Sequence, residues 1–436
     1  MTLPDEPRTG PDPLALRLPG PRRRFVVDAS PLRRNHDFRL LWGGRFVTGI
    51  GSMVTYVALP FQVYQLTGSS WTVGLLGLVE FVALMCTVFL GGALADAVDR
   101  RLMVRATEAG LLLVTVALLA NALLPHPRVA VIFVLAGVMA ALDALQRPSL
   151  DAMLPRLVPE ADLVAASALT GLSGTVAQIA GPTIGGLLLA STGTAATYAV
   201  DAVTFLACLV TLQRMQAIPP PVGGERPSLR GVAEGLRYAR SRPDLMGTYL
   251  VDMNMTFFGM PNALFPALAA GLGGPGVLGL LYSAPAVGGL VASAASGGAG
   301  RIHRHGLAIL WSAAVYGIAM LGFGLSASLP VALAFLVLAG VADMVSGIFR
   351  MTIWNTTIPD RLRGRLAGIE MIGYSSGPTL GNLESGGVAA LTGPRWSVGF
   401  GGVMCVAGTI VLAMALPAFR RYDARSVTPA GTAPNG

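Results

Sequence analysis

The sequence contains no lysine and little charge of either sign. Charged residues make up only 12% of its 436 residues, whereas a soluble domain carries roughly 25%. So few charges cannot cover a globular surface that faces water, which argues against a soluble protein. All 31 basic residues are arginine, which we interpret as the codon usage of a GC-rich genome.

Residue types that carry chemistry are also scarce. The three cysteines, Cys86, Cys208 and Cys405, lie in apolar segments and lack the spacing of a metal site. The four histidines fall in expected tails or loops, and the sequence has no Gly-x-x-x-x-Gly-Lys-Ser/Thr nucleotide-binding motif. We therefore expect no enzyme activity, no metal, no cofactor and no direct use of ATP. Energy for any transport would have to come from an ion gradient.

Long apolar segments are what the sequence has instead. Hydrophobic residues make up 53% of the chain, and its mean hydropathy is +0.63. Apolar segments of about 17–25 residues match the thickness of a bilayer core. The pattern predicts an all-α integral membrane protein with twelve transmembrane helices, at residues 40–66, 71–95, 103–124, 129–150, 163–190, 195–214, 245–271, 276–299, 306–326, 330–350, 364–391 and 396–419.

Arginine is distributed unevenly over the connections between these segments. Most loop arginines fall on alternate connections, whereas the other set of connections carries only Arg128 and Arg395. Because arginine-rich loops stay in the cytoplasm, we expect both chain termini on that side. The net charge of +8 is thus a topology signal, and we expect no nucleic-acid partner.

The longest connection divides the chain into two halves of similar length. Within it, Leu229, Val232, Ala233 and Leu236 recur at helical spacing opposite arginine, which predicts an amphipathic helix on the membrane surface. The predicted parts are a disordered cytoplasmic tail (1–37), an N-terminal six-helix bundle (38–214), a cytoplasmic linker (215–244), a C-terminal six-helix bundle (245–420) and a second disordered tail (421–436).

The two halves contain similar segments in corresponding spans. Asp143 and Asp343 occupy the fourth and tenth spans, and each precedes an arginine, Arg147 or Arg350. Repeated halves with Gly/Pro-bearing helices indicate a transporter with a central site. The repeated Gly-Pro-Thr-x-Gly segment supplies Gly181, Pro182, Gly185 and Gly186 in the fifth span, and Gly377, Pro378 and Gly381 in the eleventh.

The connection between the second and third spans carries a motif. Residues 92–101 read Gly-Ala-Leu-Ala-Asp-Ala-Val-Asp-Arg-Arg, a very short turn in which an acid precedes a basic pair. This segment resembles the signature loop of the major facilitator superfamily, although Ala97 replaces a basic residue and Asp99 a glycine. The resemblance implies a conformational-switch loop in which Asp96 pairs with a nearby arginine or a helix N-terminus. The matching positions are Gly92, Asp96, Arg100 and Arg101.

The Gly-Pro segment of the fifth span carries a second resemblance. It is similar to the antiporter motif of the same superfamily, with Ala177 in place of a glycine of the fuller motif. A small-residue face with a proline kink can pack closely and seal one side; generic helix packing is the alternative. Over residues 30–420 the chain resembles the siderophore and multidrug exporters of the superfamily. This resemblance implies a monomer in a bacterial inner membrane that exchanges protons for a small organic molecule.

Ionisable residues inside the spans are candidates for the mechanism, because a charge in lipid is costly and usually faces a cavity or a partner. Glu80 lies among apolar neighbours and is our first candidate for the proton carrier, followed by Asp143 or Asp343. Arg45 and Arg147 complete the candidate set. A structural ion pair is the alternative for each, and Asp143 stands one helical turn before Arg147.

We therefore predict proton-coupled efflux of a siderophore-like or drug-like molecule by alternating access. An uptake permease of the same fold is an alternative, and so is a membrane sensor that transports nothing. Aromatic and methionine side chains could line an apolar cavity, with packing against lipid or core as the alternative: Tyr56, Met253, Met255, Phe257, Phe258 and Trp354.

Overall fold

The computed structural model describes residues 28–217, 237–238, 240–358 and 360–426, without the side chains of residues 88–97, 299 and 360–374. The described chain is nearly all helical and contains no strand. Its longer helices are α2 (His36–Thr67), α3 (Ser70–Ala97), α4 (Arg100–Ala122), α5 (Val129–Leu157), α6 (Leu163–Ser191), α7 (Gly193–Gln213), α9 (Pro243–Gly259), α11 (Pro275–Ala295), α12 (His305–Leu325), α13 (Leu329–Thr357), α14 (Asp360–Thr392) and α15 (Pro394–Ala415).

The helices confirm the prediction of an all-α membrane protein. Among the described residues, eleven helices are long and apolar enough to cross a membrane. The eleventh expected span, residues 364–391, falls in α14, which is 33 residues long but is not one of the eleven helices counted here. The part of α14 whose side chains are described is rich in glycine and serine, which lowers its hydropathy. It packs against α3 and α9.

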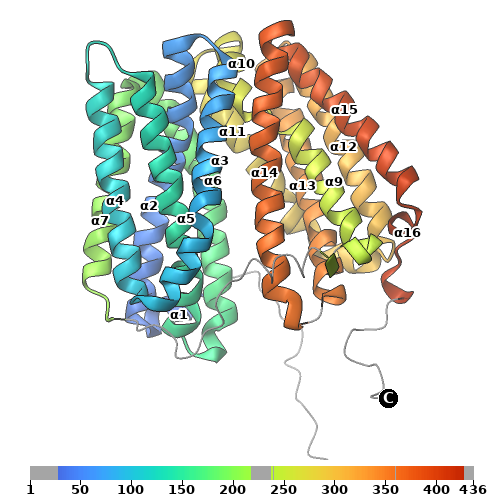
Figure 1. Cartoon of the computed structure of the whole chain (residues 1–436), viewed down its shortest axis with the longest axis horizontal. Helices are drawn as coiled ribbons and strands as arrows, with labels where there is room; N and C mark the ends of the chain where they lie inside the picture. The colour runs from blue at the N-terminus through green and yellow to red at the C-terminus, as the bar shows by residue number, and fades with distance from the viewer. Residues whose placement is uncertain (1–27, 218–236, 239, 359, 427–436) are drawn as a thin grey trace, which may run out of the picture.

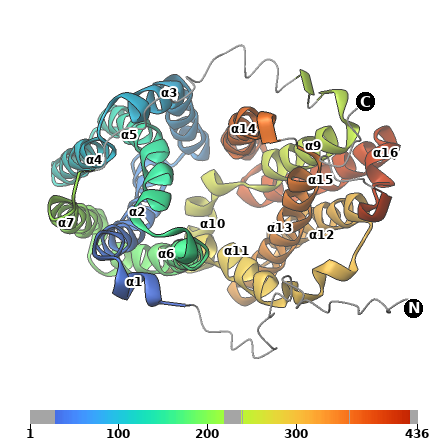
Figure 2. The ribbon, with the colours of Figure 1, turned by 90° about the horizontal axis from the view of Figure 1, so that it is seen from below.

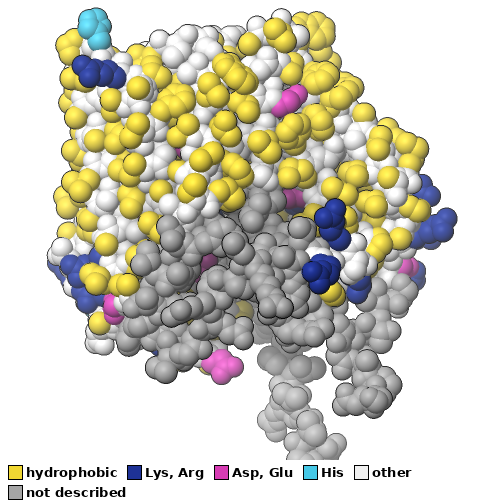
Figure 3. Space-filling model, in the orientation of Figure 1, with side chains coloured by type: hydrophobic (Ala, Val, Ile, Leu, Met, Phe, Trp, Pro, Cys, Tyr) yellow, Lys and Arg dark blue, Asp and Glu magenta, His cyan; other side chains and the backbone are white. Residues whose placement is uncertain are grey.

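The helices form two groups that lie side by side (Figures 1 and 2). One group contains α2 to α7 and the other α9 to α15, and they meet mainly where α6 contacts α11 and where α3 contacts α14. In Figure 3, hydrophobic side chains cover the sides of the molecule, and most arginines gather toward the end where the chain terminates. We refer to that end as the arginine-rich end and to the opposite one as the short-turn end.

The short-turn end is built from tight connections between antiparallel helices. Gly68 ends α2 with φ of 65°, and its N–H donates to the Tyr64 carbonyl over 2.7 Å. Gly393, between α14 and α15, has φ of 91°. Such backbone conformations are favoured by glycine, so these residues let consecutive helices reverse direction within a few residues.

The seventh predicted span, residues 245–271, is confirmed as a segment long and apolar enough to cross a membrane, Pro243–Leu272, but it is not a single helix. It consists of α9, a short 3₁₀ turn (η2, Asn262–Leu264) and α10 (Phe265–Leu272). Pro261 follows directly after Met260, where α9 has ended, and it has no N–H to continue the helix. Proline at position 266 suits the first turn of a new helix. The break leaves backbone groups in the middle of the molecule that side chains must satisfy.

The predicted tails and linker lie largely outside the described residues. This holds for residues 1–27 and 427–436 and for the expected amphipathic helix around Leu229–Leu236. Within the first predicted tail, however, the structure has a short helix, α1 (Ser30–Arg34), and α2 begins at His36 rather than at residue 38. The Asp28 carboxylate, which precedes this helix, accepts a hydrogen bond from the Ser30 N–H over 2.9 Å. Near the other terminus, the short α16 (Pro417–Arg420) and η4 (Ala424–Ser426) follow α15.

Candidate functional site

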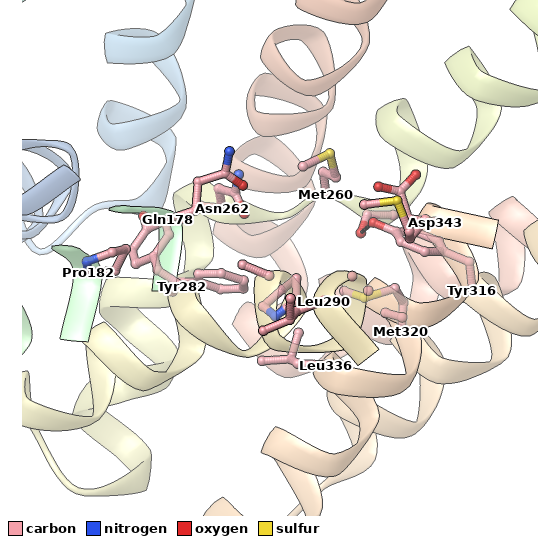
Figure 4. Close-up of a pocket in the computed structure, with 18 of the residues that line it drawn as sticks. Gln178, Pro182, Met260, Asn262, Tyr282, Leu290, Tyr316, Met320, Leu336 and Asp343 are labelled. Carbon is pink, nitrogen blue, oxygen red and sulfur yellow. Dashed lines mark hydrogen bonds between the residues drawn. The ribbon is translucent and has the colours of Figure 1, made fainter. Parts of the chain in front are cut away.

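A cavity of about 460 Å³ lies at the junction of the two helix groups, beside the break between α9 and α10 (Figure 4). Its volume is within the range of small-molecule sites, about 300–1,000 Å³. Helices α2 and α6 supply one wall, and α10 to α13 supply the others. Its most informative lining residues are Tyr56, Gln178, Pro182, Met260, Asn262, Phe265, Tyr282, Tyr316, Met320 and Asp343.

The broken span presents polar groups to this cavity. The Gly259 carbonyl accepts a hydrogen bond from the Tyr316 hydroxyl over 2.7 Å, and the Asn262 carbonyl accepts one from the Tyr282 hydroxyl over 3.0 Å. The Asn262 side-chain amide donates to the Tyr56 hydroxyl over 3.3 Å, which joins the two helix groups. Irregular backbone at membrane depth is tolerated where it is buried in protein or lines a cavity, and here it does both.

Small residues close the short-turn end above the cavity. A Cβ added to Gly186 of α6 would lie 2.6 Å from the backbone nitrogen of Gly279 in α11, so the two backbones are nearly in contact. Beside them, the hydroxyls of Thr183 and Ser283 form a hydrogen bond of 2.8 Å. On the opposite side of the junction, a Cβ at Gly74 of α3 would lie 2.7 Å from the Asn382 carbonyl in α14. We call these two contacts the glycine seal.

Of the remaining residues of the predicted antiporter-like motif, Pro182 presents its carbonyl to Gly279 of α11 across the junction, and the glycines pack within each group. A Cβ at Gly181 or Gly185 would press on α2 at Met53 or Val54. In α14, Gly377 and Gly381 approach Thr256 and Phe257 of α9 in the same way, and Pro378 lies between them. Both segments are therefore sites of close helix packing, whereas their role in antiport stays a prediction.

Glu80 lies in a separate, small cavity directly behind the main one. This cavity, of about 60 Å³, shares Tyr56, Asn262 and Tyr282 with the main cavity, so these residues form the partition between them. Asn382 of α14 also lines it, and the Asn382 side-chain oxygen accepts a hydrogen bond from the Ala263 N–H over 3.0 Å. The structure thus places Glu80 at the junction of the two groups, next to the helix break.

Asp343 lies at the end of the main cavity, where Figure 4 shows it close to Tyr316 and Met260. Its carboxylate is 3.8 Å from the guanidinium of Arg350, which also forms an ion pair with Asp252 of α9. Arg350 therefore links α13 to α9. The sequence pattern singled out Asp343 and its arginine, but it did not identify Asp252 as the partner.

Arg45 belongs to a buried polar cluster in the other helix group. Its guanidinium donates to Glu108 over 2.7 Å and to Gln146 over 3.1 Å, and the Gln146 amide donates to Glu108 over 2.9 Å. Glu108 and Gln146 have no exposed surface. Sequence analysis missed both residues, although an acid inside the apolar segment 103–124 signals a partner in another span.

Asp143 and Arg147 are both exposed on α5, and neither lines the main cavity. Their mutual pairing stays a prediction. Although Asp143 and Asp343 occupy corresponding positions in the two halves, only Asp343 faces the cavity. The chemistry of the cavity is therefore not symmetric.

The signature loop is shorter than predicted, because α3 continues to Ala97 and only residues 98 and 99 form the turn. The side chains of Gly92 and Asp96 lie outside the described part of the chain. Asp99, which departs from the family pattern, accepts a hydrogen bond from the Leu102 N–H over 2.8 Å and caps α4. Arg100 donates to the Ala152 carbonyl and Arg101 to the Leu212 carbonyl, so the pair ties α4 to α5 and α7.

Of the aromatic and methionine residues predicted to line a cavity, only Tyr56 lines the main one. Met255 is buried in the core, and Trp354 packs against Tyr249 and donates to the Thr248 hydroxyl. Phe257 lines a shallow groove beside Glu384 instead. Met253 and Phe258 are likewise not among the residues that line the main cavity.

Two groups of membrane-crossing helices around a ligand-sized cavity define the protein as a multi-pass membrane transporter. More particularly, the chain belongs to the transmembrane secretion effector family of the major facilitator superfamily, which matches residues 27–433. Its relatives and fold neighbours are transporters, not enzymes.

The chain is similar along its whole length to known exporters. It is 28% identical to the enterobactin exporter EntS of Citrobacter koseri, over 94% of this chain and 99% of that protein. It is also 28% identical to EntS of Escherichia coli O157:H7, over 95% of this chain and all of that protein.

Solved structures with low sequence identity share the fold. A bacterial homologue of the lysosomal transporter Spinster, in an inward-facing conformation, has a TM-score of 0.66 at 16% identity, over 90% of this chain and 97% of that one. A bacterial homologue of the iron transporter ferroportin, also inward-facing, has a TM-score of 0.66 at 14% identity, over 88% and 98%.

The glycine seal generates a prediction. Adding a methyl group with Gly186→Ala should force α6 away from α11, because overpacking of this kind costs about 1–3 kcal/mol. The readout is a cysteine at the buried position 283 (Ser283→Cys) in a protein without its native cysteines. This cysteine should react severalfold faster with a membrane-impermeant maleimide when Gly186→Ala is also present than when it is not. The matched control is Gly171→Ala on the same helix, where an added Cβ meets nothing within 4 Å. Equal labelling rates in the two variants would contradict the proposed importance of the contact.

The buried cluster around Arg45 generates another prediction. Arg45→Ala leaves the Glu108 carboxylate buried without its cation, and breaking such a pair destabilises a protein by about 3 kcal/mol or more. The additional change Glu108→Gln removes the uncompensated charge, so the double variant should unfold at a higher temperature than Arg45→Ala. Thermal unfolding of the purified proteins in detergent provides the comparison. Additive destabilisation in the double variant would show that the two residues do not act as a pair.

Proposed function

We propose that the protein is a proton-driven exporter of small organic molecules in a bacterial inner membrane. The observation that carries this proposal is the pair of adjoining cavities at the junction of the helix groups. The larger has room for an organic molecule, and the smaller contains the carboxyl group of Glu80. Two adjoining sites at this junction would let a substrate and a proton respond to the same conformational change.

The direction of transport is inferred from the relatives. The family is described as a secretion effector, and the EntS proteins that match nearly the whole chain are named as enterobactin exporters. Efflux of a siderophore-like or drug-like compound is therefore the function that the comparisons favour over uptake. The Gly-Pro segment of α6, which resembles an antiporter motif, supports the same direction.

Alternating access would follow from movement of the two groups around the main cavity. In the present conformation the glycine seal closes the short-turn end. The distribution of arginine favours a cytoplasmic location for the opposite end and for both termini. Opening of the seal would then expose the cavity to the outside. Since the cavity and the Glu80 compartment lie within one chain, a monomer suffices for this cycle.

Glu80 is the first candidate for the proton carrier, since it lies in the junction that must open and close. A carboxyl group in apolar surroundings is more stable protonated, whereas access to water favours its charged form. Closure and opening around Glu80 would therefore bind and release a proton. Asp343 and Asp143 are the second candidates for this role.

The proposal predicts that Glu80→Gln abolishes gradient-driven export while leaving substrate binding intact. Cells that express the protein would be loaded with a siderophore panel and a drug panel, and efflux measured with and without a protonophore. For a compound that the wild-type protein exports, the gradient-dependent efflux rate of the variant should be at least about tenfold lower, because one proton-transfer group is removed. Glu384→Gln, an acid of α14 outside both cavities, serves as the matched control.

If export by Glu80→Gln still depends on the gradient, an acidic residue other than Glu80 carries the proton. Gradient-driven accumulation in place of efflux would identify an uptake permease. If no compound moves in either direction, the transport function itself is contradicted.

A further inference from the structure

The lining of the main cavity is strongly aromatic. The rings of Tyr56, Tyr282, Tyr316 and Phe265 contribute to its walls, and Tyr282 packs edge-to-face against both Tyr56 and Phe265, with ring centroids 5.4 and 4.8 Å apart. Aromatic faces attract cations and also stack on aromatic ligands. Methionine side chains, which adapt to ligands of different shapes, fill several of the remaining positions: Met53, Met260, Met320 and Met344.

The charge carried by the described lining of the cavity has one sign. Among the lining residues that the structure describes, Asp343 is the only charged one. No arginine is among these described lining residues, and the chain has no lysine at all. The polar groups that accompany Asp343 are neutral amides and hydroxyls. A polyanion that entered this cavity would find no cation among the described lining residues to balance its charge.

The negative charge of Asp343 is not cancelled by its neighbour Arg350. The Arg350 guanidinium is paired closely with Asp252 and lies 3.8 Å from Asp343. The three side chains together carry a net charge of −1. Only 15% of the Arg350 side chain is exposed, against 53% of Asp343, so the excess negative charge is presented on the cavity side.

We propose that the main cavity selects molecules that combine an aromatic group with a protonated basic nitrogen, and that Asp343 is the counter-charge for that nitrogen. A cation that leaves water needs a partner charge to offset its desolvation. Asp343 supplies this charge, and the surrounding rings supply further cation–π attraction. The same cavity excludes polyanions, such as metal complexes of siderophores that carry several negative charges.

This inference deepens the proposed export function and assigns separate roles to the two carboxylates. Asp343 lines the large cavity, whereas Glu80 lies behind the partition of Tyr56, Asn262 and Tyr282. A cationic substrate would therefore meet Asp343 without displacing the proton site. Asp343 would then be a specificity-determining residue rather than a proton carrier.

The test uses two probes of nearly the same shape and opposite charge, tetraphenylphosphonium and tetraphenylborate. Binding of each to the purified full-length protein in detergent would be measured by titration calorimetry. We expect the cation to bind at least about tenfold more tightly than the anion, as a charge-assisted contact provides. Asp343→Asn should lose this preference through weaker cation binding, without weakening the binding of the anion.

Two further variants keep the test informative. Asp343→Glu retains the charge and should retain the preference for the cation, whereas Glu384→Gln removes a carboxyl group outside both cavities and should change nothing. Anion binding equal to or tighter than cation binding would overturn the proposal. Cation binding that is unchanged in Asp343→Asn would overturn it as well.

These outcomes are independent of the proposed export function. If cation binding depends on Asp343 but the protein exports no compound, the export function is contradicted and the binding site is supported. Gradient-driven export of neutral or anionic compounds alone would support export and overturn the assignment of substrate class.

Discussion

The close approach of α6 and α11 at Gly186 and Gly279 is the contact on which the arrangement of the two helix groups depends. Their backbones nearly touch there, and the Thr183–Ser283 hydrogen bond lies beside them. Inside a bilayer, helices are not driven together by the hydrophobic effect, so short-range van der Waals packing between small residues has to hold them. Such a contact is lost after a small separation. It can therefore seal one end of the cavity and still open without unfolding either group.

A second constraint, the need to satisfy every polar group inside the membrane, places the remaining features around this contact. The break after α9 is stabilised by Tyr282 and Tyr316, and these same residues become walls of the cavity. The buried charges are used in two ways. Arg45 and Glu108 are paired within one helix group, and with Gln146 they tie α2 to α4 and α5. Asp343 and Glu80 instead face cavities, where a substrate or a proton can reach them.

The sequence was sufficient to predict the membrane fold and the position of most spans. It also singled out Glu80 and Asp343, which the structure places beside cavities, and the glycine motif, which packs closely; their roles stay predictions. These conclusions rest on local signals, namely apolar length, small residues and isolated charges. It was not sufficient to predict the break in the seventh span, because proline also occurs inside continuous helices, as Pro182 of α6 shows. The partners of Arg45, and Asp252 as a partner of Arg350, were missed because each lies on a different helix, far away in sequence. The residues that line the cavity depend on helix rotation, which composition does not encode.

The central claim is that the glycine seal opens and closes around Glu80. The most direct test is a distance measurement between spin labels at Thr67→Cys and Leu391→Cys, exposed positions at the short-turn end of the two helix groups, in a chain without its native cysteines. If Glu80 binds the proton in the closed state, as proposed, the seal is closed at low pH and opens as the pH rises. The account predicts a single short distance at acidic pH, a second, longer distance at alkaline pH, and no such change in Glu80→Gln. A distance distribution that does not vary with pH, or that varies equally in Glu80→Gln, would contradict it.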